Sequence, residues 1–228
     1  MNSLKPSYFF DLSSFEHASL FNSCEYVWEA LDKIKGYLAK ARLGVVSANI
    51  PQGSYIVDPE LISIGKGTVI EPGAYIKGPC IIGNNCTIRH GAYIRGNVIT
   101  GDRCVIGHDT EIKNSILLDH AQAAHFAYLG DSILGNKVNL GAGTKCANLK
   151  LNHGLVAIEF EGQRVATGLR KFGAIIGDGS QLGCNSVTNP GALIGQNVCS
   201  YPCVNFGGFV PSNSVVKSES QVIVKTRK

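Results

Sequence analysis

An apolar residue recurs at every sixth position through most of this chain. The series runs from Ile64 to Ile94 and again from Ile106 to Leu118, with Thr100 as the exception between them, and it returns from Ile176 to Phe206. A helix has a period of about 3.6 residues and a strand a period of about 2, so neither explains this spacing. Smaller residues come four positions after the leading ones: Thr68, Ala74, Cys80, Cys86, Ala92, Val98, Cys104 and Thr110.

Six residues suffice for one short strand and one turn, and three such units close a triangular coil of eighteen residues. The sequence therefore predicts an all-β fold, a parallel β-helix, over roughly residues 46–215. Two interruptions are expected. The register slips by four residues between Ala124 and Leu134, and the chain leaves the repeat in an excursion at about residues 147–172. Residues 216–228 are expected to form a C-terminal tail.

Residues 1–45 precede the repeats and follow a different pattern. Val27, Leu31, Ile34 and Leu38 lie at helical spacing with charged residues between them, which predicts an amphipathic helix. An open β-helix end exposes unpaired backbone groups. We expect this N-terminal helical segment to cap the open end of the first coil.

Composition restricts the class of ligand and the compartment. The apolar fraction is 44%, the net charge is +4 and the pI is near 8.6, without the dense Lys/Arg clusters of a nucleic-acid-binding protein. An anionic small molecule bearing phosphate fits this charge better. No signal peptide or membrane span is evident, so we expect a cytoplasmic protein. The eight cysteines form no CxxC pair, which favours reduced core thiols over disulfides or a metal site.

Three basic residues share one position of the repeat. Lys77, Arg95 and Lys113 are eighteen residues apart, so their side chains should stack at about one strand spacing, roughly 4.8 Å. Like charges this close repel each other unless an anion lies among them. The alternatives are a phosphate clamp or a solvated face with splayed side chains.

The repeats resemble the left-handed parallel β-helix of hexapeptide-repeat acyltransferases, a likeness that implies a left-handed coil and a homotrimer. A more specific resemblance lies within residues 95–148. It is to the acetyltransferase domain of the bifunctional glucosamine-1-phosphate acetyltransferase/N-acetylglucosamine-1-phosphate uridyltransferase family. The motif comprises Arg95, Lys113, His125, Tyr128–Asp131, Val138–Asn139, Gly141–Thr144 and Asn148.

This resemblance implies an acetyl-CoA-dependent N-acetyltransferase acting on a hexosamine 1-phosphate, most simply glucosamine 1-phosphate. Such a reaction belongs to UDP-N-acetylglucosamine and cell-envelope precursor synthesis. His125 would be the general base that takes a proton from the sugar ammonium group, as a neutral imidazole can near pH 7. Arg95 and Lys113 would hold the sugar phosphate, and Tyr128 and Asn139 would hydrogen-bond the sugar.

The resemblance also implies a place for acetyl-CoA as co-substrate. Backbone groups around Ala142 and the side chain of Asn148 would contact its acetyl-bearing arm, and a backbone N–H would stabilise the developing oxyanion. The segment TGLRKFGAIIGD is shared with related variants, and Arg170 or Lys171 in it would contact a phosphate of the sugar or of CoA. We expect no metal to take part.

Two alternatives remain open. The nucleotidyltransferase half of the bifunctional family is missing, so the chain could be an idle sugar-phosphate-binding solenoid or the trimerising partner of a separate nucleotidyltransferase. His90, His120 and His125 loosely imitate the zinc ligands of carbonic anhydrases with this fold, so the histidines could also form zinc sites between subunits. Lys113 and His125 are twelve residues, or two faces, apart. The acetyltransferase hypothesis therefore predicts a site completed by a neighbouring subunit.

Overall fold

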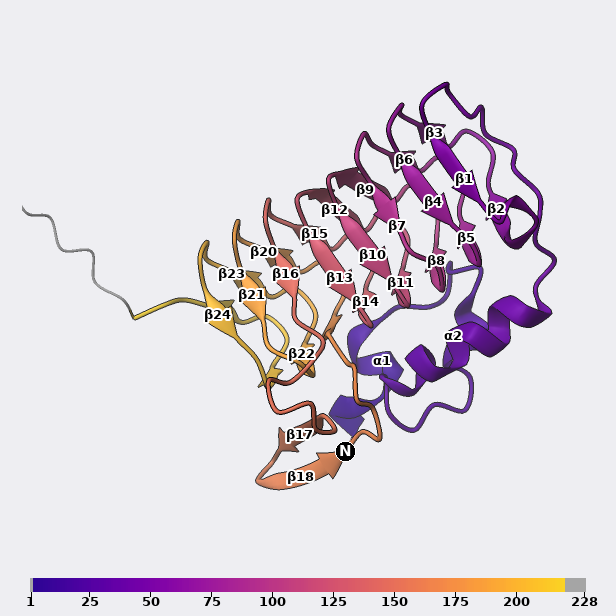
Figure 1. Cartoon of the computed structure of the whole chain (residues 1–228). Helices are drawn as coiled ribbons and strands as arrows, with labels where there is room; N and C mark the ends of the chain where they lie inside the picture. Colours follow the sequence, from indigo (N-terminus) through magenta and orange to yellow (C-terminus); the bar gives the residue numbers. More distant parts are fainter. Residues whose placement is uncertain (1, 220–228) are drawn as a thin grey trace, which may run out of the picture.

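The structure, a computed structural model, describes residues 2–219 and is a β-solenoid built from three eight-stranded sheets. All strand pairs within the three sheets are parallel, and each strand pairs with its equivalent in the next coil (Figure 1). The parallel β-helix predicted from the six-residue period is therefore confirmed. The left-handed sense of the coil stays a prediction from the resemblance.

We name two of the sheets by what lies on their outer faces and call the remaining one the third sheet. The tyrosine sheet comprises β1 (Tyr55–Val57), β4 (Tyr75–Lys77), β7 (Tyr93–Ile94), β10 (Glu111–Lys113), β13 (Tyr128–Gly130), β16 (Lys145–Cys146), β21 (Val187–Thr188) and β24 (Asn205–Phe206). The covered sheet comprises β2 (Ile62–Ile64), β5 (Cys80–Ile82), β8 (Val98–Thr100), β11 (Ser115–Leu117), β14 (Ile133–Leu134), β19 (Ala174–Ile176), β22 (Ala192–Ile194) and β25 (Phe209–Val210). The third sheet comprises β3 (Val69–Ile70), β6 (Thr87–Ile88), β9 (Val105–His108), β12 (Gln122–His125), β15 (Asn139–Leu140), β20 (Gln181–Leu182), β23 (Cys199–Ser200) and β26 (Val215–Val216).

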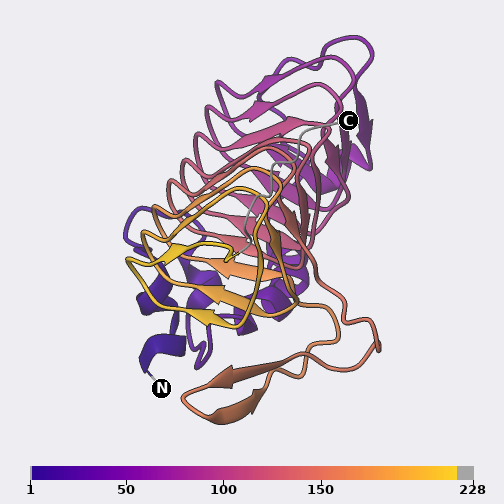
Figure 2. The same cartoon turned by 90° about the vertical axis from the view of Figure 1, so that its left-hand side faces the viewer.

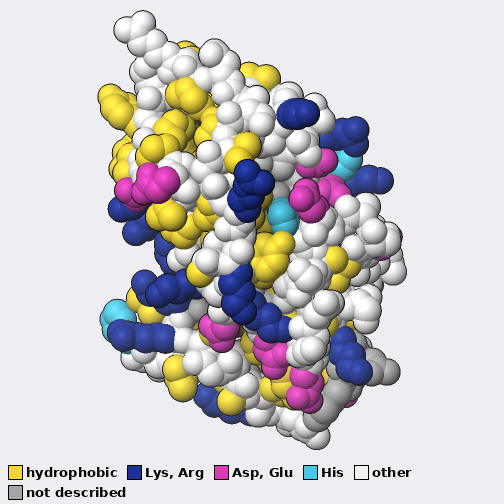
Figure 3. All heavy atoms as spheres, turned by 90° about the vertical axis from the view of Figure 1, so that its right-hand side faces the viewer, with side chains coloured by type: hydrophobic (Ala, Val, Ile, Leu, Met, Phe, Trp, Pro, Cys, Tyr) yellow, Lys and Arg dark blue, Asp and Glu magenta, His cyan; other side chains and the backbone are white. Residues whose placement is uncertain are grey.

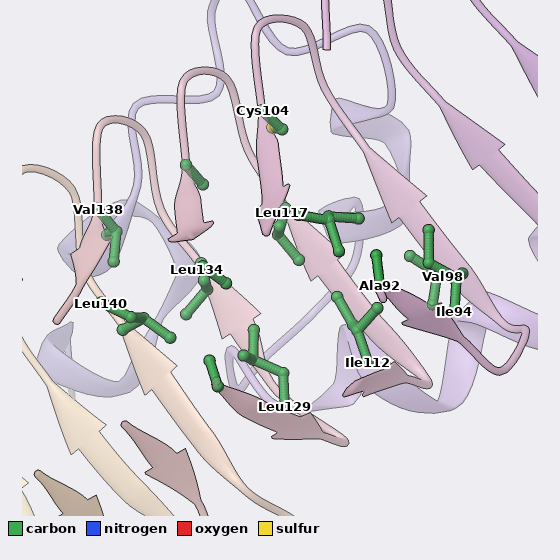
Figure 4. Packing of buried hydrophobic residues seen from close by; sticks show 14 of the residues in the cluster. Ala92, Ile94, Val98, Cys104, Ile112, Leu117, Leu129, Leu134, Val138 and Leu140 are labelled. Atoms are coloured by element: carbon green, nitrogen blue, oxygen red, sulfur yellow. The ribbon is translucent and has the colours of Figure 1, made fainter. Parts of the chain in front are cut away.

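The core fills the inside of the coils with the leading apolar residues and the smaller ones that follow them. Figure 4 shows such side chains from successive coils converging on the solenoid interior. Cys80, Cys86 and Cys104 are buried there as free thiols, as expected. Burial raises the pKa of the Cys80 thiol to about 12.

The predicted register slip is wrong in its size, and its place is only half of the answer: one shortened turn lies between Ala124 and Leu134 as predicted, and the other lies one coil earlier. Two successive coils are each one residue short, because Thr100 pairs with Leu117 and Leu117 pairs with Leu134. Leu117 therefore takes the inward position expected of Leu118 (Figure 4). Both deletions fall in the turn that joins the tyrosine sheet to the covered sheet. We call this edge the insertion corner.

The long excursion leaves the solenoid at the same corner. It carries an antiparallel hairpin of β17 (Ala157–Phe160) and β18 (Gln163–Ala166), which projects from the coils in Figure 2. Its ends lie side by side, since Leu149 bridges Lys171 and the Phe172 N–H donates to the Asn148 carbonyl at 2.9 Å. The coil therefore continues across the excursion with its pairing intact.

The N-terminal segment contains η1 (Asn2–Leu4), α1 (Pro6–Phe9), η2 (Ala18–Phe21) and α2 (Glu29–Lys40). The predicted helix is present, with Leu31, Ile34 and Leu38 buried, whereas Val27 lies just before it. It does not cap the open end. The segment packs along the outside of the covered sheet (Figure 1), because that face presents an apolar column that would otherwise be exposed: Ile99, Ile116, Ile133, Ile175 and Leu193.

The N-terminal segment and the hairpin share this role. Val156, Ile158 and Phe160 from the excursion join the same apolar cluster. At its other side the segment is held by polar contacts, with the Asp11 N–H donating to the Asp178 carboxylate at 2.7 Å. The expected boundary at residue 46 thus separates two parts that share one packed interface. Most of the expected tail, residues 220–228, lies outside the described residues.

The surface mixes both signs of charge. On the face drawn in Figure 3, Lys and Arg side chains are scattered among Asp and Glu. No helix between residues 2 and 219 is both long enough and apolar enough to cross a membrane.

Candidate functional site

Asp131 is the centre of a polar network at the insertion corner. Its carboxylate accepts hydrogen bonds from Lys113 Nζ at 2.6 Å, from Asn114 Nδ2 at 2.9 Å and from the side-chain amide of Asn148. The Tyr128 hydroxyl lies 3.5 Å from Asn148 Oδ1 and extends the network. The Lys113 and Asp131 side chains are only 16% and 9% exposed. A nearly buried ion pair thus links four residues of the sequence motif.

The shortened turns explain why these residues meet. Asn114 and Asp131 occupy equivalent positions in adjacent coils, with φ of +44° and +51°. Asn and Asp tolerate this left-handed conformation better than most residues, so they can make the tight turn. Each turn then presents its polar side chain to the next coil.

The basic ladder predicted from spacing is present, but two of its three cations are already paired with carboxylates. Lys77, Arg95 and Lys113 follow equivalent residues of paired strands. The Arg95 guanidinium lies 2.6 Å from the Glu111 carboxylate, and Lys113 is paired with Asp131. The anions among these cations therefore include two carboxylates of the chain itself. This corrects the expectation that only a bound phosphate or splayed side chains could relieve the repulsion.

Tyr128 faces this acidic environment. Burial raises the pKa of its hydroxyl, and the carboxylates of Glu111 and Asp131 add to the shift. The phenol therefore remains protonated at neutral pH. It can donate a hydrogen bond to a ligand, as the motif implies.

A cleft of about 650 Å³ opens beside the network. Its wall is formed by α2, the shortened turns and the excursion: Leu31, Asp32, Asn114, Asp131, Leu149, His153, Gly168, Leu169, Arg170 and Lys171. The ion pairs within residues 2–219 are Arg95–Glu111, His108–Asp109 and Lys113–Asp131, so Arg170 and Lys171 are in none of them. Burial, followed by the charge of Glu29, raises the pKa of Asp32. The cleft thus offers both unpaired cations and carboxylates.

His125 lies at a different edge, the turn from the third sheet to the tyrosine sheet, which we call the histidine corner. It ends β12 and pairs with His108 of the preceding coil. One coil further along lies Ala142, since the N–H of the next residue, Gly143, donates to the His125 carbonyl at 3.0 Å. Within residues 2–219 the N–H of Ala142 donates no hydrogen bond. That N–H remains available to a ligand oxygen.

Arg89 is a neighbour of His125 that the sequence pattern did not indicate. Its Nη1 lies 3.5 Å from His125 Nε2 and 3.4 Å from the Ala124 carbonyl. A guanidinium can only donate, so this contact favours a lone pair on Nε2 and a proton on Nδ1. Because the two residues are two coils apart, no local spacing rule pointed to the contact.

The structure separates the three histidines of the zinc alternative along one chain. His90 and His125 lie at the histidine corner, whereas His120 lies in the turn from the covered sheet to the third sheet. Within the described part of the chain, no group of three His, Cys, Asp or Glu side chains is placed to hold a metal ion. The three histidines cannot act together within one subunit.

The motif is thus divided between two edges of the coil. Arg95, Lys113, Tyr128 and Asn148 lie on the tyrosine sheet or at the insertion corner, where Arg170 and Lys171 also line the cleft. His125 and Ala142 lie at the histidine corner. Asn139 lies on the outer face of the third sheet, paired with Gln122 and Gln181.

Comparison with known sequences places the chain in a family. The GMPPB C-terminal domain matches residues 76–223, which cover most of the solenoid. The chain belongs to this family. The family is described as one domain of a larger protein, and it takes in both shortened turns and the excursion.

Curated relatives confirm the resemblance to bifunctional nucleotidyltransferase/acetyltransferases. A bifunctional sugar-1-phosphate nucleotidylyltransferase/acetyltransferase of Sulfurisphaera tokodaii is 38% identical over 88 residues, 39% of this chain and 22% of that protein. The bifunctional protein GlmU of Methanococcus aeolicus is 32% identical over 114 residues, 50% of this chain and 28% of that protein. The matched region spans about a quarter of the length of these relatives.

One solved structure is similar to the chain at a greater distance. The UDP-N-acetylglucosamine acyltransferase of Arabidopsis is 12% identical, with 75% of this chain and 70% of that chain covered at a TM-score of 0.42. This likeness is too distant to bear on function.

The Lys113–Asp131 pair predicts a contrast in stability. Lys113→Ala leaves the Asp131 carboxylate nearly buried without its cation, which should lower the free energy of unfolding by about 3 kcal/mol. Arg95→Ala removes the exposed pair with Glu111 and should cost less than about 1 kcal/mol. Urea unfolding of both variants measures the difference. Equal, small losses would contradict a structural role for the buried pair.

Proposed function

We propose that the protein is an acetyl-CoA-dependent N-acetyltransferase acting on a hexosamine 1-phosphate, with glucosamine 1-phosphate as the simplest substrate. The reaction would supply UDP-N-acetylglucosamine and cell-envelope precursor synthesis. The observation that carries the proposal is the convergence of one part of the motif at the insertion corner. There Lys113, Tyr128 and Asn148 surround Asp131, beside a cleft that holds the unpaired Arg170 and Lys171.

The charges of this corner suit a sugar that carries both an amine and a phosphate. Arg170, Lys171 and the unshared donors of Arg95 would hold phosphate oxygens, since a guanidinium has five N–H donors and Glu111 occupies only part of them. Lys113 is less free than the motif implies, because Asp131 already holds its ammonium group. Lys113 would then act on the phosphate through the electrostatic field of the network and not through a direct hydrogen bond.

His125 would supply the base. It would accept a proton from the sugar ammonium group, and the free amine would attack the thioester carbonyl carbon. The new C–N bond forms as the C–S bond breaks. One amine proton passes through His125 to the departing CoA thiolate, and the other goes to water. The unpaired Ala142 N–H, one coil away, would donate to the carbonyl oxygen as it gains negative charge.

We further propose that the site is shared by copies of the chain in a homotrimer. The base at the histidine corner and the phosphate-binding residues at the insertion corner lie at opposite edges of the tyrosine sheet. A neighbouring solenoid that faced this sheet would bring one copy's His125 toward the other's Arg95. Asn139 and Asn148 would then act on the sugar and on the CoA arm, respectively, as the motif implies, although Asn148 is already bound to Asp131.

A second candidate is a domain without catalysis, which binds sugar phosphates or trimerises a separate nucleotidyltransferase. Two observations favour it. The family is described as the C-terminal domain of a larger protein, and Lys113 is neutralised by Asp131. Coenzyme A separates the two candidates, because a ligand stabilises the folded state that binds it. CoA should raise the Tm of the acetyltransferase and leave that of a scaffold unchanged.

The proposal predicts acetyl transfer from acetyl-CoA to glucosamine 1-phosphate. Thioester loss should be followed by absorbance, because Cys184, Cys199 and Cys203 are exposed and would react with thiol reagents. His125→Ala should fold normally and lose about a hundredfold or more of the rate. His120→Ala, at another corner, is the matched control and should keep it.

Two results would count against this mechanism. The absence of transfer to every amino-sugar phosphate would remove the proposed activity. Full turnover by folded His125→Ala would exclude His125 as the general base. Asp131, or a water held by Asn139, would then be the next candidate.

The shared site predicts complementation between inactive variants. Arg95→Ala and His125→Ala should each be poorly active alone, whereas trimers assembled from both should regain part of the activity at interfaces that keep both residues. Co-refolded mixtures and separately folded controls are compared by the same assay, with light scattering to measure the assembly. A monomer, or mixed trimers without recovery, would show that each chain carries its own site.

A further inference from the structure

Phe126 has a backbone conformation that is unusual for phenylalanine. Its φ is +52°, in the left-handed region, which is uncommon for a bulky side chain. Equivalent turns of the histidine corner use smaller residues: Gly73, Gly91, Asp109, Gly143, Asn185 and Cys203. Between residues 2 and 219, every other non-glycine residue with positive φ is polar or a cysteine. Phe126 is therefore an exception within its own column.

The Phe126 ring contributes little to the packing of the core. It is 51% exposed and belongs to neither apolar cluster of the protein. Its contacts are with two imidazoles, edge-on to His108 at 5.0 Å and tilted to His125 at 6.5 Å between ring centroids. Backbone strain that packing does not offset is concentrated at functional sites.

The position of the ring suits one part of the proposed reaction. An amine hydrogen-bonded to His125 lies about 3 Å from the imidazole, and the carbonyl carbon that it attacks lies about 3 Å from the amine. The acyl group attached to that carbon would then reach the neighbourhood of Phe126, given the 6.5 Å between the two rings. An aromatic face offers no hydrogen bond to the sugar hydroxyls, but it suits an apolar methyl group.

We propose that Phe126 is a specificity-determining residue, the apolar wall against which the acyl group of the thioester rests beside His125. This inference rests on the proposed function, since it assumes that an acyl thioester meets an amine at His125. The wall would favour a short acyl group and would exclude longer ones by its bulk. The strained backbone at residue 126 would be retained because the ring contacts the donor.

The test is Phe126→Gly. Glycine adopts positive φ freely, so the variant should fold with a Tm equal to that of the wild type or about 2–4 °C higher. Acetyl transfer should fall about tenfold or more, the ratio of butyryl to acetyl transfer should rise, and the KM for glucosamine 1-phosphate should change least. Lys137→Gly, also at positive φ but at another corner, controls for the backbone change.

Other results would overturn the inference in recognisable ways. An equal loss with both thioesters would exclude contact with the acyl group, and a raised sugar KM alone would place the sugar on the ring. Loss of the trimer would make the ring a subunit contact, and a Tm several degrees lower would make it a packing residue. Acetyl transfer by Phe126→Gly at the wild-type rate would exclude a role for Phe126 in acyl binding and would leave the proposed function intact.

A binding measurement keeps the test independent of turnover. The Tm increase with acetyl-CoA is compared with that of CoA for both proteins. If the wild type gains more from acetyl-CoA and Phe126→Gly does not, the acyl contact is supported even in the absence of catalysis. If the wild type gains equally from both, the contact is excluded, and if it gains from neither and transfers nothing, both proposals fall.

Discussion

The structure depends on the stacking of each coil directly on the one before it. Parallel pairing holds equivalent residues of neighbouring coils about 4.8 Å apart along each sheet. A residue can therefore be added or removed only in a turn, because a change within a strand would shift every inward side chain outward. This chain places both deletions and its long excursion at one edge, the insertion corner. The irregular edge of an otherwise regular solenoid is where the polar network and the cleft lie.

The same stacking governs the charges. Lys77, Arg95 and Lys113 would repel one another on adjacent strands, yet Glu111 and Asp131 lie among them and pair with two of the three. The nearly buried pair ties Asn148, at the start of the excursion, to the shortened turns. The excursion then places Arg170 and Lys171 at the cleft without carboxylate partners. One corner therefore holds a fixed internal ion pair beside cations that remain free for an anion.

The period of six predicted the three sheets and the inward residues because it reports side-chain direction, which is local. It failed at Leu118, since one deleted residue in a turn leaves a leucine at either of two neighbouring positions, and pairing selects Leu117. The outward column of Ile99, Ile116 and Ile133 indicates a covered sheet. The six-residue period follows the inward residues, so it did not include this column. The helix was therefore predicted correctly and placed on the wrong surface.

The candidate site was predicted in part for a similar reason. The motif identified which residues to examine, and the coil period placed His125 and Lys113 on different faces, as the strands confirm. The pairing of Lys113 with Asp131 was not predicted, because it depends on the shortened coil that brings the two turns together. Arg89 reaches His125 across two coils, and Asp32 enters the cleft from a helix far away in sequence. Such contacts follow from tertiary packing and leave no local pattern.

Hydrogen exchange can show whether the insertion corner is the ligand-binding edge of the solenoid. Amide exchange is measured by mass spectrometry with and without glucosamine 1-phosphate and CoA. If ligands bind there, exchange should be slower in peptides that contain residues 113–115, 130–132 and 168–172. Peptides that contain the turns at residues 84–85, 102–103 and 136–137, which lie between the covered sheet and the third sheet, should be unchanged. Protection of those turns instead, or equal protection along the whole solenoid, would contradict ligand binding at the insertion corner.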